Sequence, residues 1–176
     1  MDTTALNYDP VADGDDGSCT YFCDPYVGTS VSTDASCYYG NDGEATVTVP
    51  NAIGGTTLSN TWLWSDGQTS STAIGLAAGT YTVTVSDAGT GCSTSDVVVV
   101  GEATEITVTS VAQATMPGSA TGTITAIVSG GTPSYAYSWS NSSGVVVGLT
   151  ADVDSLSYDI YTLTVTDDNA CTTSHT

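Results

Sequence analysis

The residues best suited to bind a metal ion stand near the start of the chain. Four carboxylates, Asp9, Asp13, Asp15 and Asp16, crowd into one turn-rich stretch, and the amide of Asn7 precedes them. The chain contains no Lys or Arg that could neutralise these carboxylates. Ca²⁺ binds about six to eight oxygens from carboxylates, amides and backbone carbonyls. We therefore predict a calcium site here, although it lacks the closing Glu of an EF-hand. The alternative is a solvated acidic loop.

The remaining polar residues do not form a recognisable catalytic set. His175 is the only histidine, and no lysine is present for Schiff-base or phosphate chemistry. Two carboxylate pairs, Asp152 with Asp154 and Asp167 with Asp168, have the residue types of a glycoside hydrolase. Neighbouring Asp residues in turns are more often caps, turn formers or calcium ligands. We expect a protein that is not an enzyme.

The cysteines number five, so at least one is free, bonded to another chain or separated from its partner. Cys19 and Cys23 are close enough in sequence to bridge locally. A bond from Cys23 to Cys171 of a neighbouring chain is the alternative for that pair. A zinc site is rejected because Cys19 and Cys23 lack a second pair of ligands.

The composition excludes several classes of partner. Nineteen acidic residues and no Lys or Arg give a formal net charge of −19, so no Lys or Arg in the chain can clamp phosphates or anionic lipids. Only 11 % of the residues are charged, which is far from the composition of a disordered acidic tail. We expect no nucleic acid partner. No signal-peptide pattern follows Met1, and no apolar run is long enough to span a membrane, so we expect no membrane insertion and an export signal elsewhere.

One stretch occurs twice and defines the organisation of the chain. Residues 76–87 and 156–167 both place a Tyr five positions after a Leu and then alternate apolar with hydroxyl side chains. This period of two predicts a half-buried strand. A Tyr at the start of such a strand, here Tyr81 and Tyr161, resembles the tyrosine corner of immunoglobulin-like sandwiches, where the hydroxyl bonds to upstream backbone.

The sequence therefore predicts an all-β chain of two tandem immunoglobulin-like antiparallel β-sandwiches behind an acidic, calcium-binding-like loop segment. The predicted domains are 1–27, 28–102 and 103–176. Trp64 and Trp139 are the expected core tryptophans, packed with Tyr81 and Tyr161. The predicted strands are 28–33, 45–49, 60–64, 71–75, 80–86, 96–100, 106–111, 123–128, 135–139, 145–149 and 161–166.

The second sandwich is expected to lack its last strand. Cys92 is followed by the run Val97–Val100, whereas only Thr-Thr-Ser-His-Thr follows Cys171. The sheet edge left open would be covered either in a longer array of domains or by a strand from another copy.

Several of these motifs resemble the SprB-type repeat of gliding-motility adhesins. The resemblance rests on Trp64-Ser-Asp-Gly67, the stretch 76–87 and Gly91-Cys92 in the first copy, and on 130–141 and 161–171 in the second. Residues 7–19 resemble a short acidic motif ending Asp-Asp-Gly-Ser-Cys that accompanies such repeats. The family implies export by the type IX route, a cell-surface or extracellular location, and adhesion.

The resemblance also bears on the cysteines. Family pattern and strand order both pair Cys37 with Cys92, while Thr115 stands where a partner for Cys171 would be expected. We therefore predict a Cys37–Cys92 disulfide and an unpaired or intermolecular Cys171.

Two functions follow from the sequence as hypotheses. The first is a structural or adhesive segment of an extracellular stalk or filament, stiffened by disulfide and calcium, with neighbouring repeats or copies of itself as partners. The second is a carbohydrate-binding module of a secreted hydrolase, which would need exposed aromatic side chains to bind surface glycans. Its candidates are Trp62, Tyr38, Tyr39, Tyr135 and Tyr158.

Overall fold

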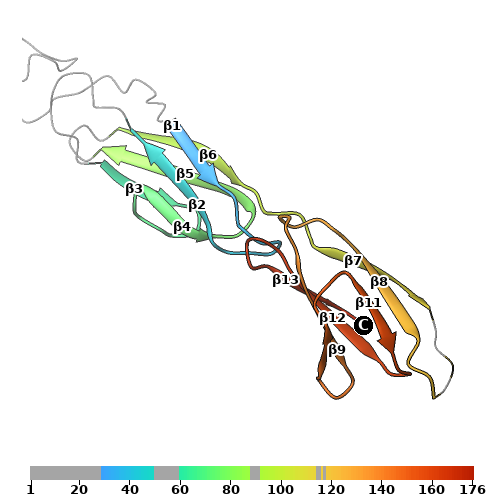
Figure 1. Ribbon diagram of the computed structural model, residues 1–176. Helices are drawn as coiled ribbons and strands as arrows, with labels where there is room; N and C mark the ends of the chain where they lie inside the picture. The colour runs from blue at the N-terminus through green and yellow to red at the C-terminus, as the bar shows by residue number, and fades with distance from the viewer. Residues whose placement is uncertain (1–28, 50–59, 88–91, 114–115, 117) are drawn as a thin grey trace, which may run out of the picture. The chain divides into compact units, whose positions relative to one another are not determined.

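The computed structural model describes residues 29–49, 60–87, 92–113, 116 and 118–176. The chain divides into two compact units, each described here by itself. Unit 1 comprises Met1–Asp34 and Asn41–Gly101, and unit 2 comprises Ala35–Gly40 and Glu102–Thr176. Secondary structure in the described residues is entirely β, and every strand pairing between named strands is antiparallel (Figure 1). The predicted all-β antiparallel class is confirmed.

Thirteen strands make up the described part of the chain. They are β1 (Thr29–Thr33), β2 (Gly43–Thr48), β3 (Asn60–Trp64), β4 (Thr72–Leu76), β5 (Gly79–Asp87), β6 (Ser93–Val100), β7 (Thr107–Gln113), β8 (Gly122–Ser129), β9 (Ala136–Asn141), β10 (Val146–Gly148), β11 (Asp152–Leu156), β12 (Tyr161–Thr166) and β13 (Thr172–His175).

Unit 1 is a sandwich of two three-stranded sheets. One sheet has the order β1-β2-β4 and the other β3-β5-β6. Both contribute to one hydrophobic core, because Ala45 and Val47 of β2 pack in the same buried cluster as Val83 and Val85 of β5. Alternate residues of a strand face opposite sides of its sheet, so the valines of β5 enter the core while its threonines face outward.

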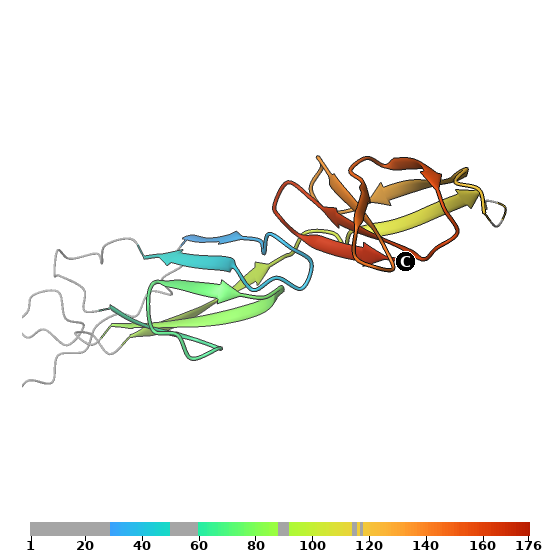
Figure 2. The ribbon, with the colours of Figure 1, turned by 60° about the horizontal axis from the view of Figure 1, so that its bottom comes forward.

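Unit 2 repeats this plan with one additional strand. Its sheets have the orders β11-β8-β7 and β10-β9-β12-β13. The core again draws on both sheets, with Ala126 of β8 and Val153 of β11 packed in one cluster with Leu163 and Val165 of β12. Figure 2 shows the two layers of strands in each unit from a second direction.

A tryptophan occupies the same structural position in each core. Trp64 and Trp139 are both 2 % exposed. The indole N–H of Trp64 donates to the Ser70 carbonyl at 2.8 Å, and that of Trp139 donates to the Thr150 carbonyl at 3.0 Å. Each ring is therefore buried with its one polar group satisfied.

A tyrosine marks the start of the central strand in each unit. The Tyr81 hydroxyl donates to the Ala77 carbonyl at 3.0 Å, and the Tyr161 hydroxyl donates to the Ser157 carbonyl at 2.8 Å. Both rings are half-buried and pack against their cores. Each bond joins a strand to the bend before it, which is the geometry that the repeated Leu-to-Tyr spacing predicts.

The predicted strands are all present, two of them (60–64 and 161–166) with the observed bounds of β3 and β12 and the others with shifted ends, but two strands were missed. β11 was missed because its sequence, Asp-Val-Asp-Ser-Leu, carries carboxylates that favour a turn. β11 has the position in its sheet of unit 2 that β4 has in unit 1. Both strands have a residue of positive φ before their last Leu, namely Gly75 at 69° and Ser155 at 56°.

The second missed strand corrects a prediction. The last strand of the second sandwich was expected to be absent, yet β13 pairs with β12 from Leu163–His175 to Thr166–Thr172. Four residues rich in Thr lack the apolar alternation by which strands are recognised. The hydrogen bonds of the neighbouring β12 nevertheless hold them in the sheet.

Candidate functional site

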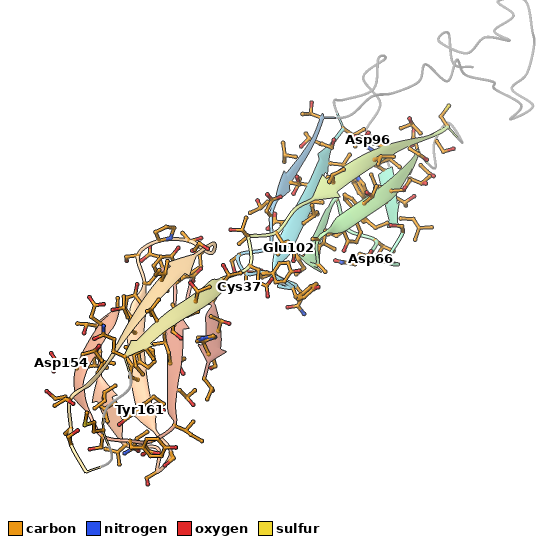
Figure 3. The ribbon with its side chains drawn as sticks, turned by 90° about the vertical axis from the view of Figure 1, so that its right-hand side faces the viewer. Cys37, Asp66, Asp96, Glu102, Asp154 and Tyr161 are labelled. Carbon is orange, nitrogen blue, oxygen red and sulfur yellow. A yellow bond between two sulfur atoms is a disulfide. The ribbon has the colours of Figure 1, made fainter. Side chains whose placement is uncertain are left out.

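The most distinctive site in the molecule joins residues that are far apart in sequence. The segment Ala35–Gly40 follows β1 in the chain, but it packs within unit 2. Ala35 is 2 % exposed, forms a parallel bridge with Glu102, and accepts a hydrogen bond from the Ala103 N–H at 3.1 Å. The backbone N–H of Tyr39 donates to the Glu102 carboxylate. We call Ala35–Gly40 the clasp segment (Figure 3, where Cys37 and Glu102 are labelled).

A disulfide fixes the clasp segment to unit 2. Cys37 is bonded to Cys171, with an S–S distance of 2.00 Å, a Cα–Cα distance of 5.6 Å and a sequence separation of 134 residues. Cys171 lies directly before β13. The bond therefore closes a covalent loop around most of the described chain.

This disulfide overturns the predicted cysteine pairing. Cys37 does not pair with Cys92, and Cys171 is neither unpaired nor bonded to another chain. The prediction assumed that each sandwich keeps the cysteines of its own sequence region, whereas the clasp segment leaves unit 1 and brings Cys37 to unit 2. Cys92 is also disulfide-bonded. The predicted Cys19–Cys23 bridge lies outside the described residues.

A buried carboxylate organises the loop that carries Cys171. Asp167 is 6 % exposed, and its oxygens accept backbone N–H bonds from Thr132 at 2.8 Å, Cys171 at 2.9 Å and Asn169 at 3.0 Å. The bond from Thr132 is the main cause that lowers the pKa of Asp167 below its ordinary value, with those from Cys171 and Asn169 adding to it, while burial opposes them. Asp167 thus acts as an ionised structural anchor.

Asn169 connects this anchor to the clasp segment. Its side-chain N–H₂ donates to the Ser36 carbonyl and to the Thr132 hydroxyl, both at 3.2 Å. The loop between β12 and β13 therefore holds the clasp segment by an amide hydrogen bond next to the covalent bond.

A small hollow beside the disulfide has an acidic lining. It measures about 170 Å³ and is bordered by both cysteines, Tyr38, Glu105 and Asp167 among other residues. The pKa of Tyr38 is raised to about 12, first by its hydrogen bond with Tyr39 and by the charge of the Tyr39 phenolate, then by desolvation, and least by the carboxylates of Glu105 and Glu102. The negative potential has no cationic side chain to balance it.

The structure separates the carboxylates that were considered as catalytic pairs. Asp167 is buried and bonded to backbone, while Asp168 is exposed. Asp152 and Asp154 lie two residues apart on β11, and both are exposed (Asp154 is labelled in Figure 3). In neither pair do two carboxylates converge on a shared cavity.

The predicted metal ligands cannot be placed. Asn7, Asp9, Asp13, Asp15 and Asp16 all lie outside the described residues. Within residues 29–49, 60–87, 92–113, 116 and 118–176, no three His, Cys, Asp or Glu side chains come together as a metal site. Those ranges also contain no helix long and apolar enough to cross a membrane.

The histidine has a partner that the sequence did not indicate. His175 Nε2 lies 3.1 Å from the Ser110 hydroxyl, which links β13 to β7. Ser110 is exposed and His175 is half-buried. The pair therefore connects two strands of unit 2.

Of the aromatic candidates for sugar binding, Tyr38 and Tyr39 lie together, with ring centroids 4.1 Å apart, and the others are dispersed. Trp62 packs against the core of unit 1, and Tyr135 packs against that of unit 2 with its hydroxyl bonded to the Gly130 carbonyl. Tyr39 and Tyr158 are 82 % and 84 % exposed. Tyr158 precedes β12, whereas Tyr39 lies in the clasp segment beyond the other end of that strand.

Comparison with known proteins gives a partial family match. The model of the SprB repeat matches residues 117–144, which include β8 and β9 of unit 2. No curated protein matches the chain. A structure of three N-terminal domains of the Hoc outer capsid protein of bacteriophage RB49 is similar at 20 % identity, with a TM-score of 0.48. The alignment covers 85 % of this chain and 57 % of that structure, a likeness too low to support an argument about function. Unit 2 thus contains a segment similar to an SprB repeat.

Proposed function

We propose that this chain is a non-enzymatic structural segment of an extracellular adhesin stalk or filament, built from two immunoglobulin-like sandwiches. The observation that carries the proposal is the SprB-repeat match in unit 2 together with the same Trp and Tyr anchors in unit 1. A building block used twice in one chain is typical of proteins that span a distance.

The disulfide supports a location outside the cell. Disulfides persist in oxidising compartments and are rare where thiols are kept reduced. The Cys37–Cys171 bond and the lack of Lys and Arg both suit a protein on the cell surface, reached by the type IX route that the repeat implies. Calcium bound by the acidic N-terminal stretch remains part of the proposal as a second stiffening element, and neighbouring repeats or copies are its proposed partners.

Labelling of intact cells tests this proposal. An antibody raised against the chain should stain unpermeabilised cells of the source organism, and deletion of the coding segment should reduce their attachment to surfaces. Staining that appears only after permeabilisation would contradict the extracellular assignment.

A carbohydrate-binding module is the second candidate, favoured by the exposure of Tyr39 and Tyr158. Because these rings lie beyond opposite ends of β12, they cannot stack on one short glycan. Isothermal titration with common polysaccharides should give no signal at millimolar concentration. A clear binding isotherm would favour the module over the stalk.

A further inference from the structure

Unit 2 exposes a run of aliphatic side chains at the side where its two sheets end in β10 and β11. Val145, Val146, Val147 and Leu149 are between 37 % and 69 % exposed. They follow one another along the segment that leads from β9 through β10 to β11, so they occupy one short stretch of the surface. We call these four residues the aliphatic platform. A contiguous exposed apolar surface of this kind is typical of an interaction site.

Hydrogen bonds and close packing hold the platform in place. The Asn141 N–H donates to the Val145 carbonyl at 3.0 Å, and the Asn141 side-chain oxygen accepts from the Val145 N–H at 2.9 Å. At the other end of β10, Gly148 lies so close to the core that a Cβ would be 2.9 Å from a methyl carbon of Val153. The platform is therefore ordered before a partner binds, which lowers the entropic cost of binding.

Unit 1 builds the same turn with a polar surface. The N–H of Trp64, the last residue of β3, donates across the turn to the carbonyl of Gln68. The N–H of Asn141, the last residue of β9, donates across its turn to Val145. From these acceptors onward the sequence reads Gln-Thr-Ser-Ser in unit 1 and Val-Val-Val-Gly in unit 2. The fold of the turn therefore does not require aliphatic side chains.

The platform lies in an uncharged region of a strongly acidic chain. No Asp or Glu occurs between Glu105 and Asp152, although the chain has nineteen acidic residues. Two copies repel one another wherever their carboxylates approach, so copies can meet more readily through an uncharged apolar surface. Carboxylates do border the platform, because Asp159 is hydrogen-bonded to Ser142 in the turn. Contact between copies should therefore depend on salt, which screens the repulsion between these charges.

We propose that the aliphatic platform is the surface through which this chain binds a second copy of itself. Two identical apolar surfaces related by a two-fold axis are complementary to one another. The corresponding turn of unit 1 is polar, so the contact closes as a dimer and does not extend into a fibre. The inference rests on the proposed function, in which copies of the chain are partners, and names the surface at which they meet.

A single pair of chains should associate weakly. The platform has four residues, whereas a stable interface has roughly 20–30 residues on each side. Backbone pairing adds little, because β10 has only three residues and its pairing with β9 is irregular between Val146 and Gly148. Chains held side by side on a cell surface would have a high effective concentration, at which a weak contact is sufficient.

Sedimentation equilibrium of the purified full chain tests the proposal at about 0.01 M and about 1 M salt, where the screening lengths are roughly 30 Å and 3 Å. A chelator in both buffers prevents divalent ions from bridging carboxylates. We expect monomers at low salt and a monomer–dimer equilibrium at high salt, with protein up to about 1 mM, the range of weak association. Monomers in both buffers, or growth beyond the dimer, would overturn the proposal. So would a dimer that survives a non-reducing denaturing gel, because that dimer is disulfide-linked.

A variant that carries the polar residues of unit 1 identifies the surface. Val145→Gln/Val146→Thr/Val147→Ser should dimerise at least tenfold more weakly than the wild type at high salt. The control is Val111→Thr/Ile127→Thr, which changes two exposed aliphatic side chains on β7 and β8 in the same uncharged region. The control should dimerise as the wild type does. Equal dimerisation of the two variants would contradict the role of the platform.

A single substitution decides the matter if near-UV circular dichroism shows that the triple variant does not fold. Leu149→Gln leaves the turn and β10 unchanged, and it should weaken dimerisation about threefold. Unchanged dimerisation of this variant would count against the platform. These measurements use the purified chain and do not depend on its location. Surface labelling of cells can therefore fail while dimerisation is observed, and the reverse.

Discussion

At the scale of single residues, the buried carboxylate of Asp167 has the clearest consequence for stability. Its folded pKa lies below that of the unfolded chain, which is near 4, so its stabilisation is fully present above that value. The stabilisation is lost as the pH falls through the lowered folded pKa. Asp167→Asn should cost on the order of 1–3 kcal/mol at neutral pH, because one amide oxygen cannot accept all three N–H bonds.

Chemical unfolding at pH 7 and at pH 3 checks this prediction. The loss of stability at pH 3 should be smaller in Asp167→Asn than in the wild type. The control is Asp168→Asn, which makes the same replacement at an exposed carboxylate. It measures the effect of removing one negative charge from this highly acidic chain. If both variants show the same pH dependence, Asp167 is not the anchor.

The tyrosine hydroxyl at the start of β12 is a second residue whose contribution can be isolated. Tyr161→Phe removes only the donor to the Ser157 carbonyl, and a loss of about 0.5–1.5 kcal/mol is expected. Tyr158→Phe, at a ring that is 84 % exposed, should be neutral. Thermal unfolding of the two variants provides the comparison, and equal melting temperatures would contradict the role of the bond.

At the scale of elements, a single side chain completes the edge of β4. Gln68 accepts from the Ile74 N–H at 3.0 Å and donates to the Ile74 carbonyl at 2.9 Å, as a neighbouring strand would. Ile74 itself is 63 % exposed. Unpaired strand edges with apolar side chains promote association between molecules. Gln68 therefore protects this edge.

Removal of that side chain should make the protein self-associate. We expect Gln68→Ala to form dimers and larger species with rising concentration, because both backbone groups of Ile74 become available for pairing. Light scattering after size-exclusion chromatography measures this, with Gln113→Ala on exposed β7 as control. A monomeric Gln68→Ala at high concentration would argue against edge protection.

The elements also show what the sequence could predict and what it could not. Alternation of apolar and hydroxyl residues identified β5 and β12, because the core selects one face of each strand. β11 and β13 were missed because carboxylates and threonines supply no such contrast. The pairing of Cys37 was wrong for a different reason: the partner of a loop cysteine depends on which unit the loop packs against, and local pattern does not contain that information.

At the scale of the whole molecule, calcium remains a prediction. Asp9, Asp13, Asp15 and Asp16 lie close in sequence without a basic residue, so chelation should increase their mutual repulsion. We expect a lower melting temperature in EDTA than in roughly millimolar calcium. Identical melting temperatures in the two buffers would contradict the predicted calcium site. They would not bear on the two sandwiches or on the disulfide.

The central claim is that an exported chain is closed by a bond between Cys37 and Cys171. Non-reducing peptide mapping of the protein recovered from its native cells tests this most directly, with cleavage at acidic residues because trypsin has no site. The account predicts a cross-linked peptide pair that contains Cys37 and Cys171. Free thiols at both positions, or Cys37 joined to Cys92, would contradict it.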